Sequence, residues 1–299
     1  RRYGRTLALD RASLSVEKGQ ILGLVGRNGA GKTTLIRLIS GQSRPTSGEL
    51  ALFGASSPSA LDRARSRTGV MVETPAFYPY LTAEQNLEYY RIQRGIPGRS
   101  CVDEALELVR LTGAGKKKFK TFSLGMKQRL GLALALMNQP EFLLLDEPIN
   151  GLDPEGIVEF RELLLRLNRE RQTTILISSH ILSELSALAT HYAFIDRGRM
   201  LETISAADLR ERCRDCLELR VDDAARAAQV LEEQLGTRDF EVLPQERLRL
   251  YAFLDQPQTV NRVLMEQGVG LISAQQKDSN LEDYFLSLID GHSAGKEGV

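Results

Sequence analysis

The chain has 299 residues, enough for one large domain and a smaller one with a substantial core. Its 39 basic and 39 acidic residues leave no net charge, so the overall charge does not indicate nucleic acid as a partner. No apolar stretch approaches the roughly 18–20 residues that a membrane span needs, and no signal peptide is evident.

The first twenty residues predict extended structure. The chain starts at Arg1 without an initiator Met, and we expect that it begins inside a longer native chain. Alternating apolar positions at 7–9 and 14–16 predict two β segments, and residues 17–20 supply a turn. Tyr3 is either an ordinary core or surface aromatic residue, or a ring that stacks on a nucleotide base beside the loop that follows.

Residues 21–40 are the stretch around which we expect the chain to be organised. Residues 21–25 predict a buried strand and residues 34–40 an amphipathic helix. The loop between them matches the phosphate-loop pattern G-x-x-x-x-G-K-[ST], in the context of strand, loop and helix that the motif requires. The loop consists of Gly26, Arg27, Asn28, Gly29, Ala30, Gly31, Lys32 and Thr33, and Thr34 follows it.

The residue types of this loop explain how it would bind an anion. Its three glycines allow a tight turn whose N–H groups approach a phosphate, and the helix N-terminus adds partial positive charge. Lys32 would reach the β- and γ-phosphates, and the Thr33 hydroxyl would bind Mg²⁺. The alternative is a glycine-rich turn without a ligand, which the Lys-Thr pair in register between strand and helix disfavours.

Residues 41–139 predict loops followed by helices. Residues 41–54 indicate a loop with a hairpin around Ser47-Gly48, and a strand at 68–72 ends at Glu73. Helices are expected at 61–66, 82–94, 102–111 and 130–137, the second with a capping box formed by Thr82 and Gln85. Ser123 is a candidate N-cap for the last. The basic run at 116–120 is either a solvated helix end or a contact for an acidic partner.

Buried strands and helices alternate from residue 142 to 196, which predicts a mostly parallel sheet. Strands at 142–145, 174–179 and 192–196 and helices at 155–169 and 182–189 are expected, with a hairpin signal at 196–198. Asp146 and Glu147 follow the first of these strands and His180 follows the second. The carboxyl ends of parallel strands are where α/β sheets bind ligands.

These polar residues fit a site for phosphate chemistry. Asp146 would hold Mg²⁺ through water, and Glu147 would orient or deprotonate the attacking water. His180 would contact the γ-phosphate. The alternatives are a helix cap or solvated pair for the two acids and a structural role for the histidine, and the nearby phosphate loop favours the first interpretation.

The composition changes after about residue 205. The strand and helix order βαββαβ over residues 217–274 predicts a small split-βαβ sandwich, followed by a last helix at 281–289 and a polar, disordered tail. Three cysteines do not make a disulfide framework and fit a reducing cytoplasm. Cys213 and Cys216 have redox or half-zinc spacing, but without a second pair we interpret the spacing as coincidence.

Taken together, residues 3 to about 200 resemble an ABC transporter ATP-binding subunit. The residues that carry the resemblance are the aromatic Tyr3, the Walker A loop 26–34, the signature Phe122-Ser-Leu-Gly-Met-Lys-Gln-Arg, the Walker B strand 142–147, the D-loop Asn150-Gly-Leu-Asp153 and the switch histidine His180. The resemblance implies an α/β fold: a RecA-like P-loop domain with a helical subdomain and an N-terminal antiparallel sheet. The strand and helix pattern after residue 205 predicts a small α+β C-terminal domain in addition.

The resemblance also implies a mechanism. ATP and Mg²⁺ would bind between two copies of the chain that close head to tail, so that Ser123 and Gly125 of one copy serve the γ-phosphate of the other. Asp153 would contribute to the nucleotide site, and Tyr3 would stack on the adenine. Hydrolysis would open the dimer and drive separate membrane permeases at the cytoplasmic face of the cell membrane. No nucleic acid is expected as a partner.

Two features depart from the usual pattern of that family. Leu124 and Met126 stand where the signature usually has Gly and Gln, although Ser123 and Gly125 remain. Glu73 stands where most members have Gln, and its carboxylate could bind a Mg²⁺ water but cannot donate as an amide does. With the C-terminal Leu281-Glu-Asp-Tyr-Phe, these features resemble the bacitracin- and lantibiotic-immunity exporter ATPases. We therefore expect Glu73 to act in catalysis and to tune coupling to a permease.

The sequence thus predicts an ATP-hydrolysing exporter subunit. Residues 1–205 would form the ATP-binding domain with a helical subdomain at about 78–139, residues 206–290 the small domain and 291–299 a flexible tail. The expected catalytic residues are Lys32, Glu73, Glu147 and His180. The transported substrate would be an amphipathic antimicrobial peptide. Two alternatives remain: an ATPase of another ABC system, for drug efflux or copper-site maturation, or a soluble ABC ATPase that acts on ribosomes or DNA.

Overall fold

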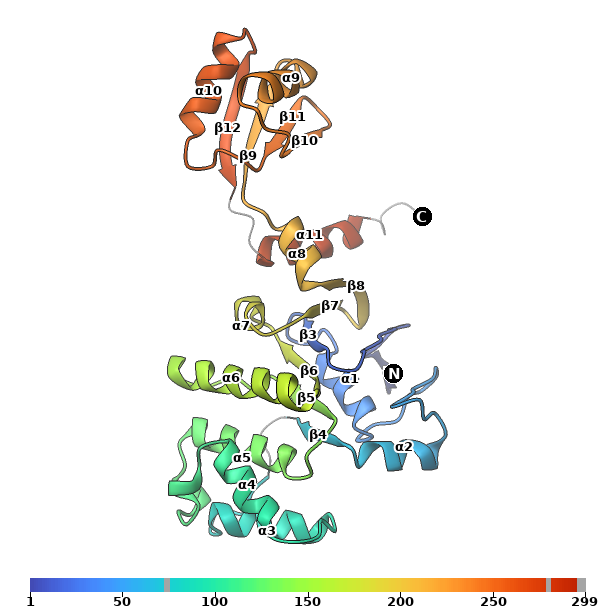
Figure 1. Cartoon of the computed structure of the whole chain (residues 1–299). Helices are drawn as coiled ribbons and strands as arrows, with labels where there is room; N and C mark the ends of the chain where they lie inside the picture. Colours follow the sequence, from blue (N-terminus) through green and yellow to red (C-terminus); the bar gives the residue numbers. More distant parts are fainter. Residues whose placement is uncertain (73–75, 278–280, 295–299) are drawn as a thin grey trace. The chain divides into compact units, whose positions relative to one another are not determined.

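The computed structural model describes residues 1–72, 76–277 and 281–294. The chain divides into two compact units, Arg1–Ala206 and Ala207–Val299, and each has a sheet of its own (Figure 1). Glu73 and the last five residues of the expected tail lie outside the described residues, so their predicted roles are not addressed by the structure.

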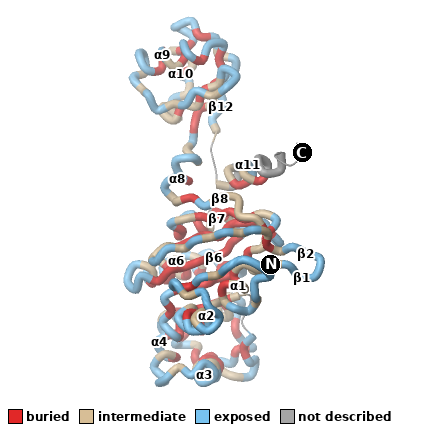
Figure 2. Tube along the Cα trace, turned by 90° about the vertical axis from the view of Figure 1, so that its right-hand side faces the viewer, coloured by how far each residue is buried: buried red, intermediate tan, exposed pale blue. Residues whose placement is uncertain are grey.

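The first unit is built on a six-stranded sheet with the strand order β4-β5-β6-β3-β7-β8. Neighbouring strands are parallel except β8, which pairs antiparallel with β7. Every residue of β3, β5 and β6 is buried (Figure 2), as expected for strands with helices on both faces. The strands are β3 (Ile21–Val25), β4 (Thr68–Met71), β5 (Phe142–Asp146), β6 (Thr174–Ser179), β7 (His191–Asp196) and β8 (Arg199–Ser205).

Helices cover both faces of this sheet. On one face, Leu22 and Leu24 of β3 belong to the same core cluster as Ile36 of α1. On the other face, a Cβ at Gly23 would lie 3.0 Å from the Leu185 side chain of α7. The helices of the first unit outside the helical subdomain are α1 (Lys32–Ile39), α2 (Pro58–Arg65), α6 (Pro154–Arg171) and α7 (Leu182–Ser186). The doubly covered parallel sheet confirms the predicted fold class.

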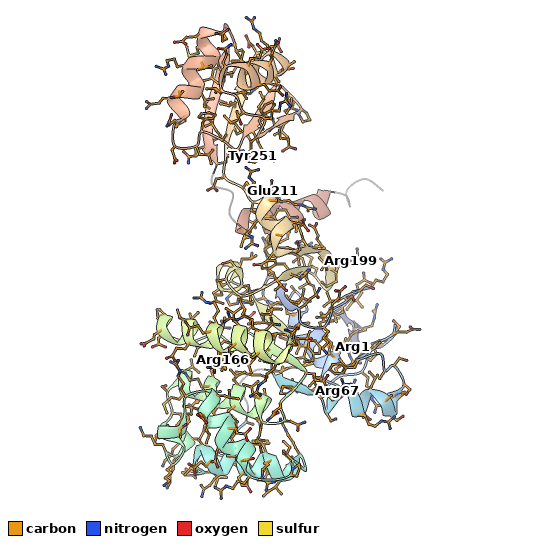
Figure 3. The ribbon with its side chains drawn as sticks, viewed as in Figure 1. Arg1, Arg67, Arg166, Arg199, Glu211 and Tyr251 are labelled. Carbon is orange, nitrogen blue, oxygen red and sulfur yellow. The ribbon has the colours of Figure 1, made fainter. Side chains whose placement is uncertain are left out.

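The strand register decides which residues meet at the edge of the sheet. Val25, the last residue of β3, is the partner of Ser179 in β6, and Asp146 of β5 is the partner of Ser178. The carboxyl ends of β3, β5 and β6 therefore lie side by side. At the opposite ends of β4 and β5, Arg67 (labelled in Figure 3) forms two 2.7 Å hydrogen bonds through its guanidinium with the Glu141 carboxylate.

The predicted helical subdomain contains α3 (Ala83–Gln93), α4 (Ser100–Leu108) and α5 (Leu124–Leu136), with 3₁₀ turns at Thr112–Ala114 and Phe119–Thr121. Both hydrogen bonds of the Thr82–Gln85 capping box are present, and Ser123 accepts from the Met126 N–H as the N-cap of α5. These two capping predictions are confirmed. A fully buried Asn86 accepts a 2.7 Å bond from the Tyr78 N–H and so shapes the loop before α3.

Two predictions about the first 55 residues are wrong. The N-terminal hairpin consists of β1 (Arg2–Tyr3) and β2 (Thr6–Leu7), whereas residues 14–16 form no strand. Leu14 and Val16 alternate because they cover the core from outside, without pairing. The expected hairpin at Ser47-Gly48 lies instead at Phe53-Gly54, where both residues have positive φ and an isolated bridge joins the flanking positions.

The second unit has a four-stranded antiparallel sheet of order β10-β11-β9-β12, which confirms the predicted split-βαβ arrangement. Leu219 and Leu248 on one sheet face pack with Leu231 of α9 and Leu264 of α10. The elements are α8 (Ala206–Arg212), β9 (Cys216–Val221), α9 (Ala224–Gln234), β10 (Phe240–Leu243), β11 (Arg247–Leu250), α10 (Pro257–Glu266), β12 (Leu271–Lys277) and α11 (Leu281–Ala294).

Two details of this region differ from the predictions. Helix α8 differs from the prediction, since the change in composition near residue 205 predicts a boundary there and no helix. The last helix, α11, also continues to Ala294, four residues into the stretch predicted to be a flexible tail. Strand β8, in contrast, completes the hairpin predicted at 196–198, because it pairs antiparallel with β7.

Candidate nucleotide-binding site

The loop between β3 and α1 has the backbone that its glycines predict. Gly29 and Gly31 have φ values of 81° and 113°, which disfavour other residues. A Cβ at Gly26 would lie 2.5 Å from the Ile195 carbonyl oxygen, so a side chain does not fit there. The first turn of α1 has no side-chain cap and no acidic residue, so its N–H groups point at a place suited to an anion.

A hollow of about 370 Å³ lies at this loop. Its volume is within the range of small-molecule sites. Arg27, Lys32 and Arg197 bring positive charge to its lining, and Glu147 provides the one carboxylate among the lining residues. The lining consists of residues 27–34 of the loop and α1, Thr6, Leu7, Ala8, Glu147, Arg197 and Gly198.

The Lys32 ammonium is held inside the loop. The residue is only 5% exposed, and its Nζ donates a 2.6 Å hydrogen bond to the Gly26 carbonyl oxygen. The same Nζ lies 3.1 Å from Glu147 Oε1. A buried ammonium needs anionic partners, and a phosphate at this position would supply one.

Glu147 lies at the centre of the polar contacts. Its φ of 48° is unusual for a residue with a side chain, and its N–H donates a 2.9 Å bond to Ser178 Oγ. Its Oε2 lies 2.7 Å from Nδ1 of His180. Burial opposes ionisation of the Glu147 carboxyl, but His180 and the Lys32 ammonium outweigh it and hold the pKa below its ordinary value. The strained backbone thus presents an ionised carboxylate to the hollow.

Asp146 is buried at the end of β5. Its Oδ1 accepts a 2.6 Å hydrogen bond from Ser178 Oγ, and Ser178 is fully buried on β6. One hydroxyl therefore orients both acids, since it also accepts from the Glu147 N–H. Ser178 is not among the site residues predicted from the sequence. The signal that could have found it is the pair of serines that follows three apolar residues directly before His180.

The residues present fit a Mg²⁺ ion that is completed by phosphate and water. Thr33 in the first turn of α1 and Asp146 are the oxygen ligands that this hard cation prefers. Among the described residues, no group of three or more His, Cys, Asp or Glu side chains could hold a metal alone. Mg²⁺ commonly uses one or two carboxylates together with substrate phosphates, which agrees with this sparse set.

Tyr3 lines a different hollow, of about 670 Å³, with Arg1, Arg37 and residues 41–44. Its hydroxyl lies 3.1 Å from Ser43 Oγ, and the Arg1 guanidinium lies 4.3 Å from the ring centroid. The ring is 41% exposed. Stacking of Tyr3 on a base stays a prediction.

The predicted signature and D-loop residues do not line the hollow at the phosphate loop. Ser123 and Gly125 lie at the N-terminus of α5, where Ser123 is exposed. Asp153 is the N-cap of α6 and accepts from the Gly156 N–H. The fold therefore brings Lys32, Asp146, Glu147 and His180 together. The other three predicted residues, Ser123, Gly125 and Asp153, lie at the N-terminal ends of α5 and α6, outside the lining of this hollow.

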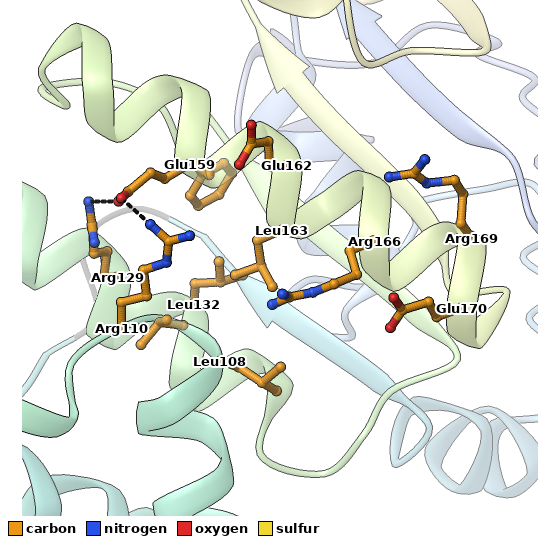
Figure 4. A pocket seen from close by; sticks show the side chains of 12 residues that line it. Leu108, Arg110, Arg129, Leu132, Glu159, Glu162, Leu163, Arg166, Arg169 and Glu170 are labelled. Carbon is orange, nitrogen blue, oxygen red and sulfur yellow. Dashed lines mark hydrogen bonds and ion pairs between the residues drawn. The ribbon is translucent and has the colours of Figure 1, made fainter.

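A third hollow, of about 340 Å³, lies between α5 and α6 (Figure 4). Leu132 and Leu163 contribute apolar surface, and Glu159 forms ion pairs with both Arg110 and Arg129. None of the predicted site residues lines it. Its ion pairs connect α6 to α5 and to the segment after α4.

Comparison with known proteins places this site in a family. Residues 9–150 match the sequence profile of the ABC transporter family. The bacitracin transport ATP-binding protein BcrA of Bacillus licheniformis is 42% identical over 98% of this chain and 96% of its own. The lantibiotic transport ATP-binding protein SrtF of Streptococcus pyogenes is 39% identical over 67% of this chain and 85% of its own.

A solved structure shares the fold. The ATP-binding cassette MJ0796, described as dimeric in a post-hydrolysis state bound to ADP and Pi, aligns with a TM-score of 0.63 and 24% identity. The alignment covers 69% of this chain and 94% of the cassette. With the family profile and the full-length relatives, the conclusion follows that the chain belongs to the ABC transporter family, as one of its ATP-binding, ATP-hydrolysing subunits.

Proposed function

We propose that the hollow at the phosphate loop binds the triphosphate of Mg·ATP and that Glu147 promotes its hydrolysis. The observation that carries this proposal is the meeting of Lys32, Glu147 and His180 at the carboxyl edge of the central strands. The loop N–H groups and Lys32 would hold the β- and γ-phosphates. Thr33 and Asp146 would hold Mg²⁺, which neutralises charge on the phosphate oxygens when bound.

Glu147 is suited to act on water because the carboxylate is ionised and fixed in position. His180 holds one oxygen, and the other points to Lys32 in the hollow. Once phosphate engages Lys32, that second oxygen is free to accept a hydrogen bond from water. Replacing Glu147 with Gln is expected to lower the ATPase rate by about 10²–10⁴-fold while ATP still binds. Normal turnover of Glu147→Gln would refute this role.

The active form is proposed to be a head-to-tail dimer. Ser123 and Gly125 lie outside the hollow of their own chain, and the related cassette MJ0796 is described as dimeric. In such a dimer, each site combines Lys32 of one copy with Ser123 of the other.

Mixed dimers test this arrangement directly. Lys32→Ala and Ser123→Arg chains should each be inactive alone. Mixing them should restore activity, because one site of the mixed dimer has both native residues. If the mixture stays inactive while each variant folds and dimerises, the shared site is wrong.

The dimer is proposed to drive separate permeases at the cytoplasmic face of the membrane. No helix among the described residues is long and apolar enough to span a bilayer. The names of the bacitracin and lantibiotic transport relatives support an amphipathic antimicrobial peptide as the exported substrate. Co-expressed with its permeases, the chain should raise the tolerance of a sensitive host to such peptides, and Glu147→Gln should not.

The alternatives predict other outcomes. Permeases of a drug or copper system co-purifying with the chain would favour another ABC system, and RNA-stimulated hydrolysis without permeases would favour a soluble ATPase.

Glu73 is proposed to tune coupling rather than basal nucleotide affinity. A carboxylate in place of an amide adds a negative charge and removes two N–H donors. Glu73→Gln should leave ATP affinity near normal while it changes peptide protection or the ATPase rate. Unchanged protection together with unchanged turnover would reject this role.

A further inference from the structure

Gln128 is a buried polar residue that the proposed chemistry does not use. It lies in the second turn of α5 and is only 8% exposed. Its Nε2 donates a 3.5 Å hydrogen bond to the Asn150 carbonyl oxygen, and its Oε1 is buried without a hydrogen-bond partner. A buried amide oxygen without a donor lowers stability, so an apolar side chain of similar size would suit a purely structural position better.

Asn150 continues this connection to the nucleotide site. Its N–H donates to the Glu147 carbonyl oxygen at 3.3 Å and closes the turn after β5. Its side-chain Nδ2 lies 3.4 Å from Glu147 Oε2, the oxygen that also contacts His180. Both side-chain bonds are long, as catalytic hydrogen bonds often are before substrate binds.

A second contact joins the same two segments. Gly151 has a φ of 80°, and a Cβ there would overlap the Leu124 side chain at the start of α5. A Cβ at Gly125 would lie 3.4 Å from Leu152. Leu124, one of the two departures from the usual signature, therefore packs on the turn that carries Asn150. The start of α5 and this turn are in contact at Leu124 as well as at Gln128.

We propose that Gln128 and Asn150 are positioning residues that connect α5 to the Glu147 carboxylate and set its orientation. Gln128 acts through the Asn150 backbone, and Asn150 acts through its side chain on Glu147. This proposal rests on the proposed role of Glu147 in hydrolysis. It adds that the position of α5, whose N-terminal end carries Ser123 and Gly125, affects the rate of that step.

The test replaces Gln128 with Met, which keeps the volume and removes both polar atoms. Because no buried donor or acceptor is left behind on α5, Gln128→Met should melt at the same temperature as the unsubstituted chain or higher. Its kcat should fall about tenfold to a hundredfold, with KM for ATP within about twofold, because Glu147 is misplaced while the phosphate loop is intact. Asn150→Ala should lower kcat by a similar factor.

The double variant separates positioning from unrelated damage. If Gln128 acts through Asn150, Gln128→Met with Asn150→Ala should be no slower than Asn150→Ala alone. Multiplied losses would overturn the proposal, and so would a Gln128→Met kcat equal to that of the unsubstituted chain. Gln93→Met, at an exposed position of α3, is the matched control and should change nothing. If the unsubstituted chain itself does not hydrolyse ATP, the proposed function fails instead.

Discussion

Nζ of Lys32 and Oε1 of Glu147 lie 3.1 Å apart, so the cation expected to bind phosphate and the carboxylate expected to act on water form an ion pair. The side chains are 6% and 20% exposed, so the pair is largely shielded from water. ATP must therefore compete with Glu147 for Lys32, and binding frees the carboxylate at the moment when it is needed.

This competition predicts that Glu147→Gln binds ATP more tightly than the unsubstituted chain. Exposed ion pairs contribute about 0.2–1 kcal/mol, and this largely shielded pair should contribute at least the upper end of that range, which corresponds to a Kd lower by about fivefold or more. Calorimetric titration with ATP would measure the change. Glu155→Gln, at an exposed position in the first turn of α6, is the control with the same loss of charge. Weaker binding by Glu147→Gln alone would contradict the prediction.

The lowered pKa of Glu147 predicts how stability depends on pH. Its ordinary pKa is 4.5, and the folded value is lower. The stabilisation from its contacts with His180 and Lys32 is therefore complete above 4.5 and is lost as the pH falls through the folded pKa. Melting temperatures measured from neutral pH into this acid range should fall more steeply for the unsubstituted chain than for Glu147→Gln. Parallel curves would show that the carboxylate contributes nothing to this dependence.

Gly26→Ala is expected to damage the phosphate loop. The new methyl group would meet the Ile195 carbonyl oxygen, which is backbone and cannot rotate away. We expect a loss of about 1–3 kcal/mol of stability and weaker ATP binding. Gly113→Ala is the control, because a Cβ there meets no atom within 4 Å and the change should cost less than about 0.5 kcal/mol. Chemical unfolding and ATP titration of both variants would check the difference.

Ser178→Ala should weaken the use of Mg²⁺ more than the binding of ATP. Without the Ser178 hydroxyl, Asp146 loses the 2.6 Å hydrogen bond that orients it. Loss of such a supporting group typically lowers metal affinity by about 10–100-fold. The Mg²⁺ concentration for half-maximal hydrolysis should rise accordingly, while ATP titrated without metal should bind as before. Ser179→Ala is the control, since that hydroxyl contacts Glu184 and the Ile181 backbone rather than Asp146. Equal Mg²⁺ dependence in both variants would count against the role of Ser178.

Features coded by neighbouring residues were predictable. The capping box of α3 needs only Thr82 and Gln85, three positions apart on one helix turn. Features that need a partner strand were not. Residues 14–16 alternate like a strand but find no neighbour to pair with, and Ser178 became a site residue only through the pairing of β5 with β6.

The sequence by itself determined the phosphate loop and the order of strands and helices around it, because glycine conformation, helix capping and apolar periodicity act over a few residues. It also placed acids and a histidine at strand ends. Only the tertiary structure decided that Glu147 contacts Lys32 and His180 together, and that Ser123 lies away from this hollow. Parallel pairing joins segments distant in the chain, and the energy of those contacts comes from packing and register that local patterns do not encode.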